Sequence, residues 1–144
     1  MPMNPAIKSS WTDNLRNPEA IQGHGTLRNE EGGRCCLDFL NQMCSDADMQ
    51  AEPVLIPSAV GGCYGYADTK SGSGDEFFFI KDGYQTVVLT NACVEWSGVS
   101  ERDPKVKWPQ DGNNGASYHL SYLNDVEGLT LPEIAELIDN DETI

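Results

Sequence analysis

The sequence predicts an α+β fold, with short helices packed around a small antiparallel sheet in a single domain. Three observations lead to this prediction. Amphipathic segments with helix-capping residues recur along the chain, two β-type runs flank a turn near residue 82, and 144 residues suffice for one hydrophobic core. Residues 1–10 are expected to form a flexible N-terminal arm, so that the domain spans residues 11–144.

The first elements are a short helix and a strand. In "SSWTDNLRNP", Ser10 and Asp13 have the spacing of a capping box, and Asn17–Pro18 stops the helix. The segment "GTLRNEEGGR" predicts a strand followed by a turn at Gly32–Gly33.

Residues 34–46, "RCCLDFLNQMCSD", form the most apolar segment and predict a buried central helix. Their apolar residues recur at helical spacing over most of the circumference, which is typical of a helix that is surrounded by other elements.

The second half of the chain predicts a hairpin and a short capped helix. Phe77–Ile80 and Thr86–Leu89 flank turn residues 81–83, which favours a hairpin. Thr90 is expected to cap a helix that ends at Gly98, and residues 100–117 are expected to be loop.

The last predicted helix spans residues 131–139. Thr130 and Glu133 form a capping box, and apolar residues follow at helical spacing. The segment resembles the first helix of a helix-turn-helix motif, but too few residues follow it to form a recognition helix, and they are acidic. We therefore expect no direct nucleic-acid binding.

The net charge of −14 is concentrated in two stretches, between Arg34 and Lys70 and after Lys107. If these stretches are adjacent in space, they form one negative face that repels nucleic acid and attracts basic proteins. The alternative is that the acidity serves solubility alone. The two stretches contain the acidic residues Asp38, Asp46, Asp48, Glu52, Asp68, Asp111, Asp125, Glu127, Glu133, Glu136, Asp139, Asp141 and Glu142.

The chain contains no run as long and apolar as a membrane span, and "MPMNPAIKSS" lacks the apolar core of a signal peptide. These features predict a cytoplasmic protein that does not bind a membrane. They indicate no particular oligomeric state.

The cysteines are expected to be structural. Cys35 and Cys36 are neighbours on a predicted helix, so their side chains point about 100° apart. None of the cysteines forms the C-x2-C pair that is typical of zinc sites, and their odd number argues against a disulfide framework. We therefore expect no metal ion and no cofactor. The other three cysteines are Cys44, Cys63 and Cys93.

Other patterns that could carry chemistry are incomplete. His24 and His119 could each meet a cysteine in space, but neither lies in a catalytic signature. Asp46 and Asp48 begin a calcium-loop pattern that fails at Gln50. The sequence therefore predicts no catalytic residue. The alternative is a small enzyme or metal-binding protein that uses Cys and His.

Several motifs together carry a family resemblance. The segments "WTDNLR", "QGHGTLR", "RCCLDFL", "LTNACVEWSG" and "LND", followed by "TLPEIAELI", resemble a family of small uncharacterised proteins of tailed phages and their bacterial hosts. The resemblance extends from Trp11 to Ile138. Asp38 stands where the family usually has Gly, and the usual third cysteine of the helix is displaced to Cys44. The resemblance implies an accessory protein of the bacterial cytoplasm that acts during phage infection.

Charge and resemblance together predict a non-catalytic accessory protein that binds a host or phage protein with a basic surface. One version is DNA mimicry, in which carboxylates replace phosphates on a host enzyme. Asn124 is expected to shape the turn before the last helix by bonding nearby backbone amides, whereas Asp125 is either part of that turn or an exposed binding carboxylate. The candidate binding residues are Asp125, Glu127, Glu133, Glu136 and Asp139.

Overall fold

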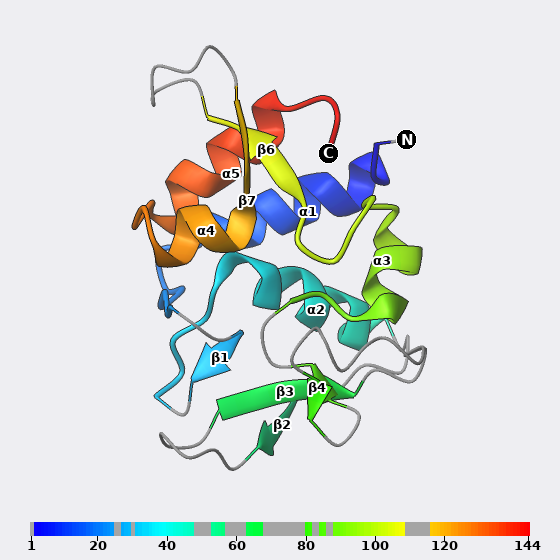
Figure 1. Ribbon diagram of the computed structural model, residues 1–144, viewed down its shortest axis with the longest axis vertical. Coiled ribbons are helices and arrows are strands. Elements are labelled where there is room, and N and C mark those ends of the chain that lie inside the picture. Colours follow the sequence, from blue (N-terminus) through cyan, green and yellow to red (C-terminus); the bar gives the residue numbers. More distant parts are fainter. Residues whose placement is uncertain are drawn as a thin grey trace.

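The computed structural model describes residues 2–24, 27–29, 31–47, 53–56, 63–67, 80–81, 84–85, 88–108 and 116–144. Figure 1 shows helix α2 crossing the middle of the molecule, with α1, α4 and α5 on one side of it and a small sheet on the other. The described helices are α1 (Pro5–Leu15), α2 (Cys36–Asp46), α3 (Asn91–Ser97), α4 (Leu120–Asp125) and α5 (Leu131–Asn140). This arrangement confirms the predicted α+β fold class.

The larger sheet is antiparallel and is organised around β3. Strands β1 and β2 both pair with Tyr64 of β3, so they lie on opposite edges of it, and β5 continues the β1 edge and pairs with β4. The strands of this sheet are β1 (Arg28–Asn29), β2 (Pro53–Ile56), β3 (Cys63–Ala67), β4 (Ile80–Lys81) and β5 (Tyr84–Gln85).

The predicted hairpin is present, and its described strands include Lys81, which was expected in the turn, and Tyr84–Gln85, which precede the expected second strand. Strands β4 and β5 pair as Ile80 with Gln85 and Lys81 with Tyr84. Val88 and Leu89 were expected to be strand, but they lie outside the described strands and are buried instead. Phe77–Phe79 lie outside the described residues.

The first helix begins earlier than predicted. Asn4, rather than Ser10, is its N-cap: the Asn4 side chain accepts hydrogen bonds from the backbone amides of Ala6 and Ile7. Pro5 stands at the first helical position, where its missing N–H costs nothing. Most of the segment expected to be an arm is therefore the first half of α1. The start of the chain is also anchored, because Met3 is buried and its amide donates to the Ile144 carbonyl at 3.0 Å.

Two helices form as their capping residues predict. Thr90 accepts from the Cys93 amide at the start of α3, and Gly98 ends that helix in the left-handed conformation. The Thr130 and Glu133 side chains form both hydrogen bonds of a capping box at the start of α5.

Part of the predicted loop at residues 100–117 is instead a two-stranded ribbon. Strand β6 (Lys105–Lys107) pairs antiparallel with β7 (Ser117–His119). In β6, Val106 is buried and the lysines on either side of it are exposed, so this strand has a single apolar residue. A single apolar position gives too weak a period to predict a strand from the sequence.

Helix α2 is the centre of the core. As predicted, it is buried along most of its circumference, and it packs on α1, α3 and α4. The buried indole of Trp11 on α1 donates a hydrogen bond to the Cys36 carbonyl at 3.0 Å, which fixes α1 to the start of α2.

Candidate functional site

The described residues form a cleft of about 310 Å³ beside α5. We call it the acidic cleft. It combines carboxylates with apolar walls, and its residues come from the end of β6, from the α4–α5 connection and from α5. It is lined by Trp108, Glu127, Gly128, Leu129, Glu133, Glu136 and Leu137.

The short connection between α4 and α5 gives the cleft its shape. Helix α4 ends at Asp125, and Gly128 adopts a φ of 70°, which favours glycine over residues with a side chain. The Leu129 amide then bonds back to the Leu123 carbonyl at 3.1 Å. This tight return places Glu127 on one side of the cleft and the first two turns of α5 on another.

Two of the carboxylates in the cleft are held in place by a hydrogen bond to one of their two oxygens. Glu127 accepts a hydrogen bond from the Tyr122 hydroxyl at 2.8 Å, and Glu133 accepts from the Thr130 amide at 2.9 Å. Within the part of the chain that the structure describes, Glu127 Oε1 and Glu133 Oε2 have no hydrogen-bond partner. Each carboxylate therefore keeps one oxygen for a ligand.

Glu136 connects the cleft to an ion-pair cluster on the neighbouring surface of α5. The Arg16 guanidinium lies 3.5 Å from Glu136 and 2.7 Å from Asp139. Its hydrogen bond with Asp139 raises the pKa of Arg16 above its ordinary value. The charge of Asp139, which was expected to contribute to a negative face, is therefore partly neutralised.

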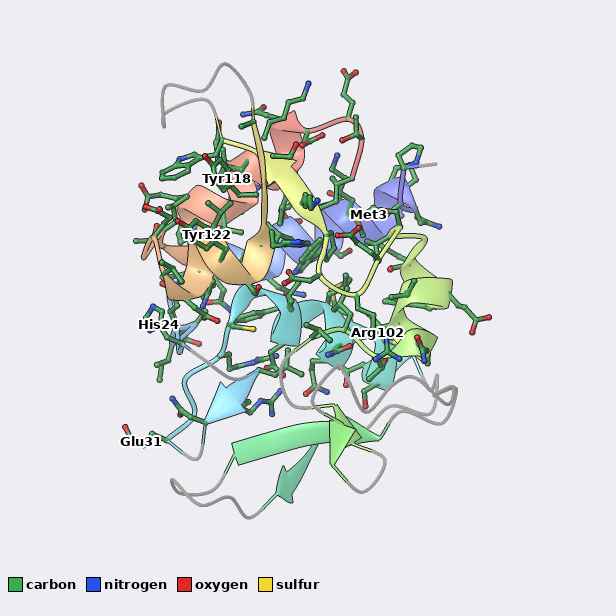
Figure 2. The ribbon with its side chains drawn as sticks, in the orientation of Figure 1. Met3, His24, Glu31, Arg102, Tyr118 and Tyr122 are labelled. Atoms are coloured by element: carbon green, nitrogen blue, oxygen red, sulfur yellow. The ribbon has the colours of Figure 1, made fainter. Side chains whose placement is uncertain are left out.

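Aromatic residues support the cleft from the ribbon and from α4. The rings of Trp108 and Tyr118 meet edge to face with centroids 5.7 Å apart, and Tyr118 stacks on Tyr122 at the same distance. Figure 2 shows Tyr118 and Tyr122 on the same side of the molecule, close to α4 and α5. The sequence did not identify Trp108, because its position depends on the pairing of β6 with β7.

Three of the five predicted binding residues, Glu127, Glu133 and Glu136, therefore share the acidic cleft. Asp139 pairs with Arg16 outside it. Asp125 does not line the cleft either: one of its oxygens accepts a hydrogen bond from Asn124 at 2.7 Å.

Asn124 is the centre of a buried hydrogen-bond network, which we call the Asn124 hub. Its oxygen accepts from Gln22 Nε2 at 2.9 Å and from the Cys36 amide at 3.3 Å, and its nitrogen donates to the Gly23 carbonyl at 2.9 Å. The side chain was expected to shape a local turn, and it does donate to neighbouring Asp125. Its other partners, however, lie 88 to 102 positions away in the sequence. Gly23 is required there, because a Cβ would lie 2.6 Å from the Gly33 carbonyl carbon.

The first acidic stretch does not extend the negative face at Asp38. Its carboxylate is fully buried and bonds the guanidinium groups of Arg28 and Arg34, with Arg28 at 3.0 Å. Arg34 stands four residues before Asp38, which is a local signal for this pair. Asp46 is exposed and accepts from Gln42, whereas Asp48 lies outside the described residues.

The predicted Cys-Cys segment is buried. Burial raises the pKa of both Cys35 and Cys36 above the ordinary value of a thiol, so both are poor nucleophiles. Cys44 and Cys93 are also buried, and the hydrogen bond from Cys93 lowers the pKa of Cys44. Cys63 lies in β3.

Among the described residues, the hydrogen bonds of the two histidines do not involve a cysteine. His24 is exposed, and His119 Nδ1 lies 2.6 Å from the Asp103 carbonyl oxygen. The Ser121 hydroxyl donates to the Asp103 carboxylate rather than to His119. The same carboxylate accepts from the Ser121 amide, so Asp103 caps the start of α4.

The described residues contain neither a metal-binding cluster nor a membrane-spanning helix. Among the described residues, no three His, Cys, Asp or Glu side chains lie close enough together to hold a metal ion. None of the helices in that part of the chain has the length and apolar character needed to cross a membrane.

Comparisons with known proteins identify a family but no characterised relative. No curated protein and no solved structure matches the chain. The family model described as "Domain of unknown function (DUF8296)" matches residues 3–142. This match covers nearly the whole sequence, including every residue of the acidic cleft and of the Asn124 hub, and the chain therefore belongs to the DUF8296 family.

Proposed function

We propose that this protein acts by binding a basic surface of another protein through the acidic cleft and the exposed residues around it. The observation that supports this most strongly is the convergence of Glu127, Glu133 and Glu136 with the Trp108 indole on one hollow. Carboxylates next to apolar and aromatic walls suit a partner that presents both positive charge and apolar area.

Exposed apolar side chains next to the cleft add to this surface. Val126 is 68% exposed and Tyr122 is 37% exposed. Both precede Glu127 in the chain, and Tyr122 bonds its carboxylate. Interfaces commonly place aromatic and aliphatic contacts inside a polar rim, so these residues extend the proposed contact area.

The charge of the surface favours a protein partner over a nucleic acid. Phosphate groups would be repelled by the carboxylates of the cleft, and a net charge of −14 opposes approach of a polyanion. The same field speeds the approach of a basic protein and makes the association sensitive to salt.

The cellular role that we propose is that of a phage-type accessory protein in the bacterial cytoplasm. The resemblance to tailed-phage and bacterial proteins supports this setting. In a more specific version, the carboxylates take the place of DNA phosphates on a host enzyme that binds nucleic acid and so inhibit it. The partner would then present the surface that it normally uses for DNA.

Affinity capture from a bacterial lysate tests this proposal. The immobilised protein is compared with a variant in which Glu127, Glu133 and Glu136 are changed to Gln and Asp139 to Asn. We expect a basic protein to be retained at low salt by the native protein alone, to be released at high salt, and to be displaced by duplex DNA if DNA mimicry operates. Retention of nothing at low salt, or equal retention by both proteins, would contradict the proposal.

A further inference from the structure

We infer that the acidic cleft receives one arginine side chain of the partner, as the anchor of the interface. This inference rests on the proposed function and specifies the group that is recognised. It follows from the size of the cleft, from the oxygens that its carboxylates leave available, and from the aromatic residue in its wall.

The cleft has the size and the walls for a single long side chain. Its volume of about 310 Å³ is at the lower end of the range of roughly 300–1,000 Å³ that small-ligand pockets span. Leu129, Leu137 and Trp108 provide apolar contacts for an aliphatic stem, and the carboxylates provide contacts for a charged head group.

The carboxylates are oriented before a ligand arrives. Tyr122 holds one oxygen of Glu127, and the Thr130 amide holds one oxygen of Glu133. Glu127 Oε1 and Glu133 Oε2 have no hydrogen-bond partner among the residues that the structure describes. Side chains that are already ordered lose less conformational entropy on binding. A guanidinium has five N–H donors in a planar fork, so it can bond one such oxygen and keep donors for a second acceptor.

The same helix already binds a guanidinium from its own chain. Arg16 lies between Glu136 and Asp139, one turn further along α5, with 2.7 Å to the Asp139 carboxylate. The acidic surface of α5 is therefore compatible with this ligand chemistry at an adjacent position.

The aromatic wall favours arginine over lysine. Trp108 lines the cleft, and Tyr118 supports its ring edge to face. A planar guanidinium stacks on an indole and at the same time donates to carboxylates, whereas an ammonium group is a compact and strongly hydrated charge.

Calorimetric titration in about 0.1 M salt, where exposed charges more than about 10 Å apart are largely screened, tests the inference with three synthetic peptides. These are hexa-arginine, hexa-lysine and hexa-citrulline. The last has nearly the shape of hexa-arginine but no charge. We expect hexa-arginine to bind at least about threefold more tightly than hexa-lysine, and hexa-citrulline not to bind. The variant Glu127→Gln/Glu133→Gln should bind hexa-arginine about tenfold more weakly. Gln at these positions can still accept from Tyr122 and Thr130, so the fold is retained.

The matched control is Glu31→Gln/Glu142→Gln, which removes the same charge at two exposed sites outside the cleft. It should weaken the binding of hexa-arginine by less than about twofold, because distant exposed charges are screened. An equal loss in both double variants, or equal binding of hexa-arginine and hexa-lysine, would overturn the arginine site but leave the proposed negative binding surface standing. Absence of binding by either basic peptide would overturn both.

Discussion

Asn124 and Glu127 lie three positions apart at the end of α4, yet one side chain is fully buried and the other is exposed. Asn124 makes hydrogen bonds to the segment at Gln22 and Gly23 and to the start of α2. Among the described residues, the Glu127 side chain accepts one hydrogen bond, from the Tyr122 hydroxyl, and it lines the acidic cleft. Buried polar groups must find all their partners within the fold, whereas an exposed carboxylate can keep an oxygen for a ligand.

The two regions are nevertheless linked by one side chain. Gln22 Nε2 donates both to Asn124 Oδ1 at 2.9 Å and to the Leu129 carbonyl at 2.7 Å. Leu129 lines the acidic cleft, so the hub fixes part of the cleft's wall. We therefore expect changes in the hub to reduce the free energy of unfolding, and conservative changes in the cleft to reduce only binding.

Asn124→Ala should have the largest effect on folding. It leaves the Gln22 amide, the Cys36 amide and the Gly23 carbonyl without their buried partner, and we expect the free energy of unfolding to fall by about 3 kcal/mol. Urea denaturation followed by circular dichroism measures this change. Asp125→Asn is the control and should unfold nearly as the native protein does. If Asn124→Ala unfolds at the native urea midpoint, the hub is not needed for the fold.

Cys36→Ser should also destabilise the fold, by about 1–3 kcal/mol, because it exchanges a buried thiol for a more polar hydroxyl. The Cys36 thiol lies 3.8 Å from the Leu120 carbonyl oxygen, at the junction of α2 and α4. Thermal melting compares this variant with Cys36→Ala. If Cys36→Ser has the same melting temperature as the native protein, the thiol does not serve as a packed apolar group.

Asp141 offers a smaller effect that depends on pH. Burial would raise the pKa of its carboxyl, but hydrogen bonds from Thr143 and from the Lys107 amide outweigh burial and lower the pKa. A depressed carboxyl pKa stabilises the fold above the unfolded-state pKa of about 3.9, and this contribution is lost as the pH falls through the folded-state value.

Asp141→Asn should therefore cost about 1 kcal/mol at pH 7 and should reduce the loss of stability in acid. Unfolding curves of the native and variant proteins between pH 7 and pH 2 measure both effects. Parallel pH profiles would show that Asp141 does not contribute to the acid sensitivity of the fold.

The smallest effect on folding is expected in the cleft itself. Glu127→Gln/Glu133→Gln should change the free energy of unfolding by less than about 0.5 kcal/mol, because both side chains are exposed and Gln retains their hydrogen bonds as an acceptor. Urea denaturation under the conditions used for Asn124→Ala makes the comparison direct. A loss as large as that of Asn124→Ala would show that the cleft is structural rather than available to a partner.

Local signals predicted the fold where they were complete. The capping box at Thr130 and Glu133, and the Thr90 cap with its terminal Gly98, placed α5 and α3 from the sequence. The predicted start of α1 was wrong, because Ser10 was chosen as the N-cap on the spacing of Ser10 and Asp13. Asn4 followed by Pro5 is an equally local signal for a helix start.

The remaining features depend on pairings that are distant in the sequence. Gln22 and Asn124 are 102 positions apart, and their contact follows only from the packing of α4 beside α2. The acids of the cleft were identified from charge alone, whereas Trp108 joins them only because β6 pairs with β7. Charge patterning therefore identified these acidic residues, but it did not predict the shape of the cleft that they line.

The division between a folding region and a binding region is tested most directly by following every backbone amide and indole N–H by NMR during titration with hexa-arginine. We expect chemical-shift changes confined to Trp108 and to residues 127–137, with signals of the Asn124 hub and of exposed Glu31 unchanged. Shifts spread evenly over all acidic surfaces, or changes centred on the hub, would contradict this division.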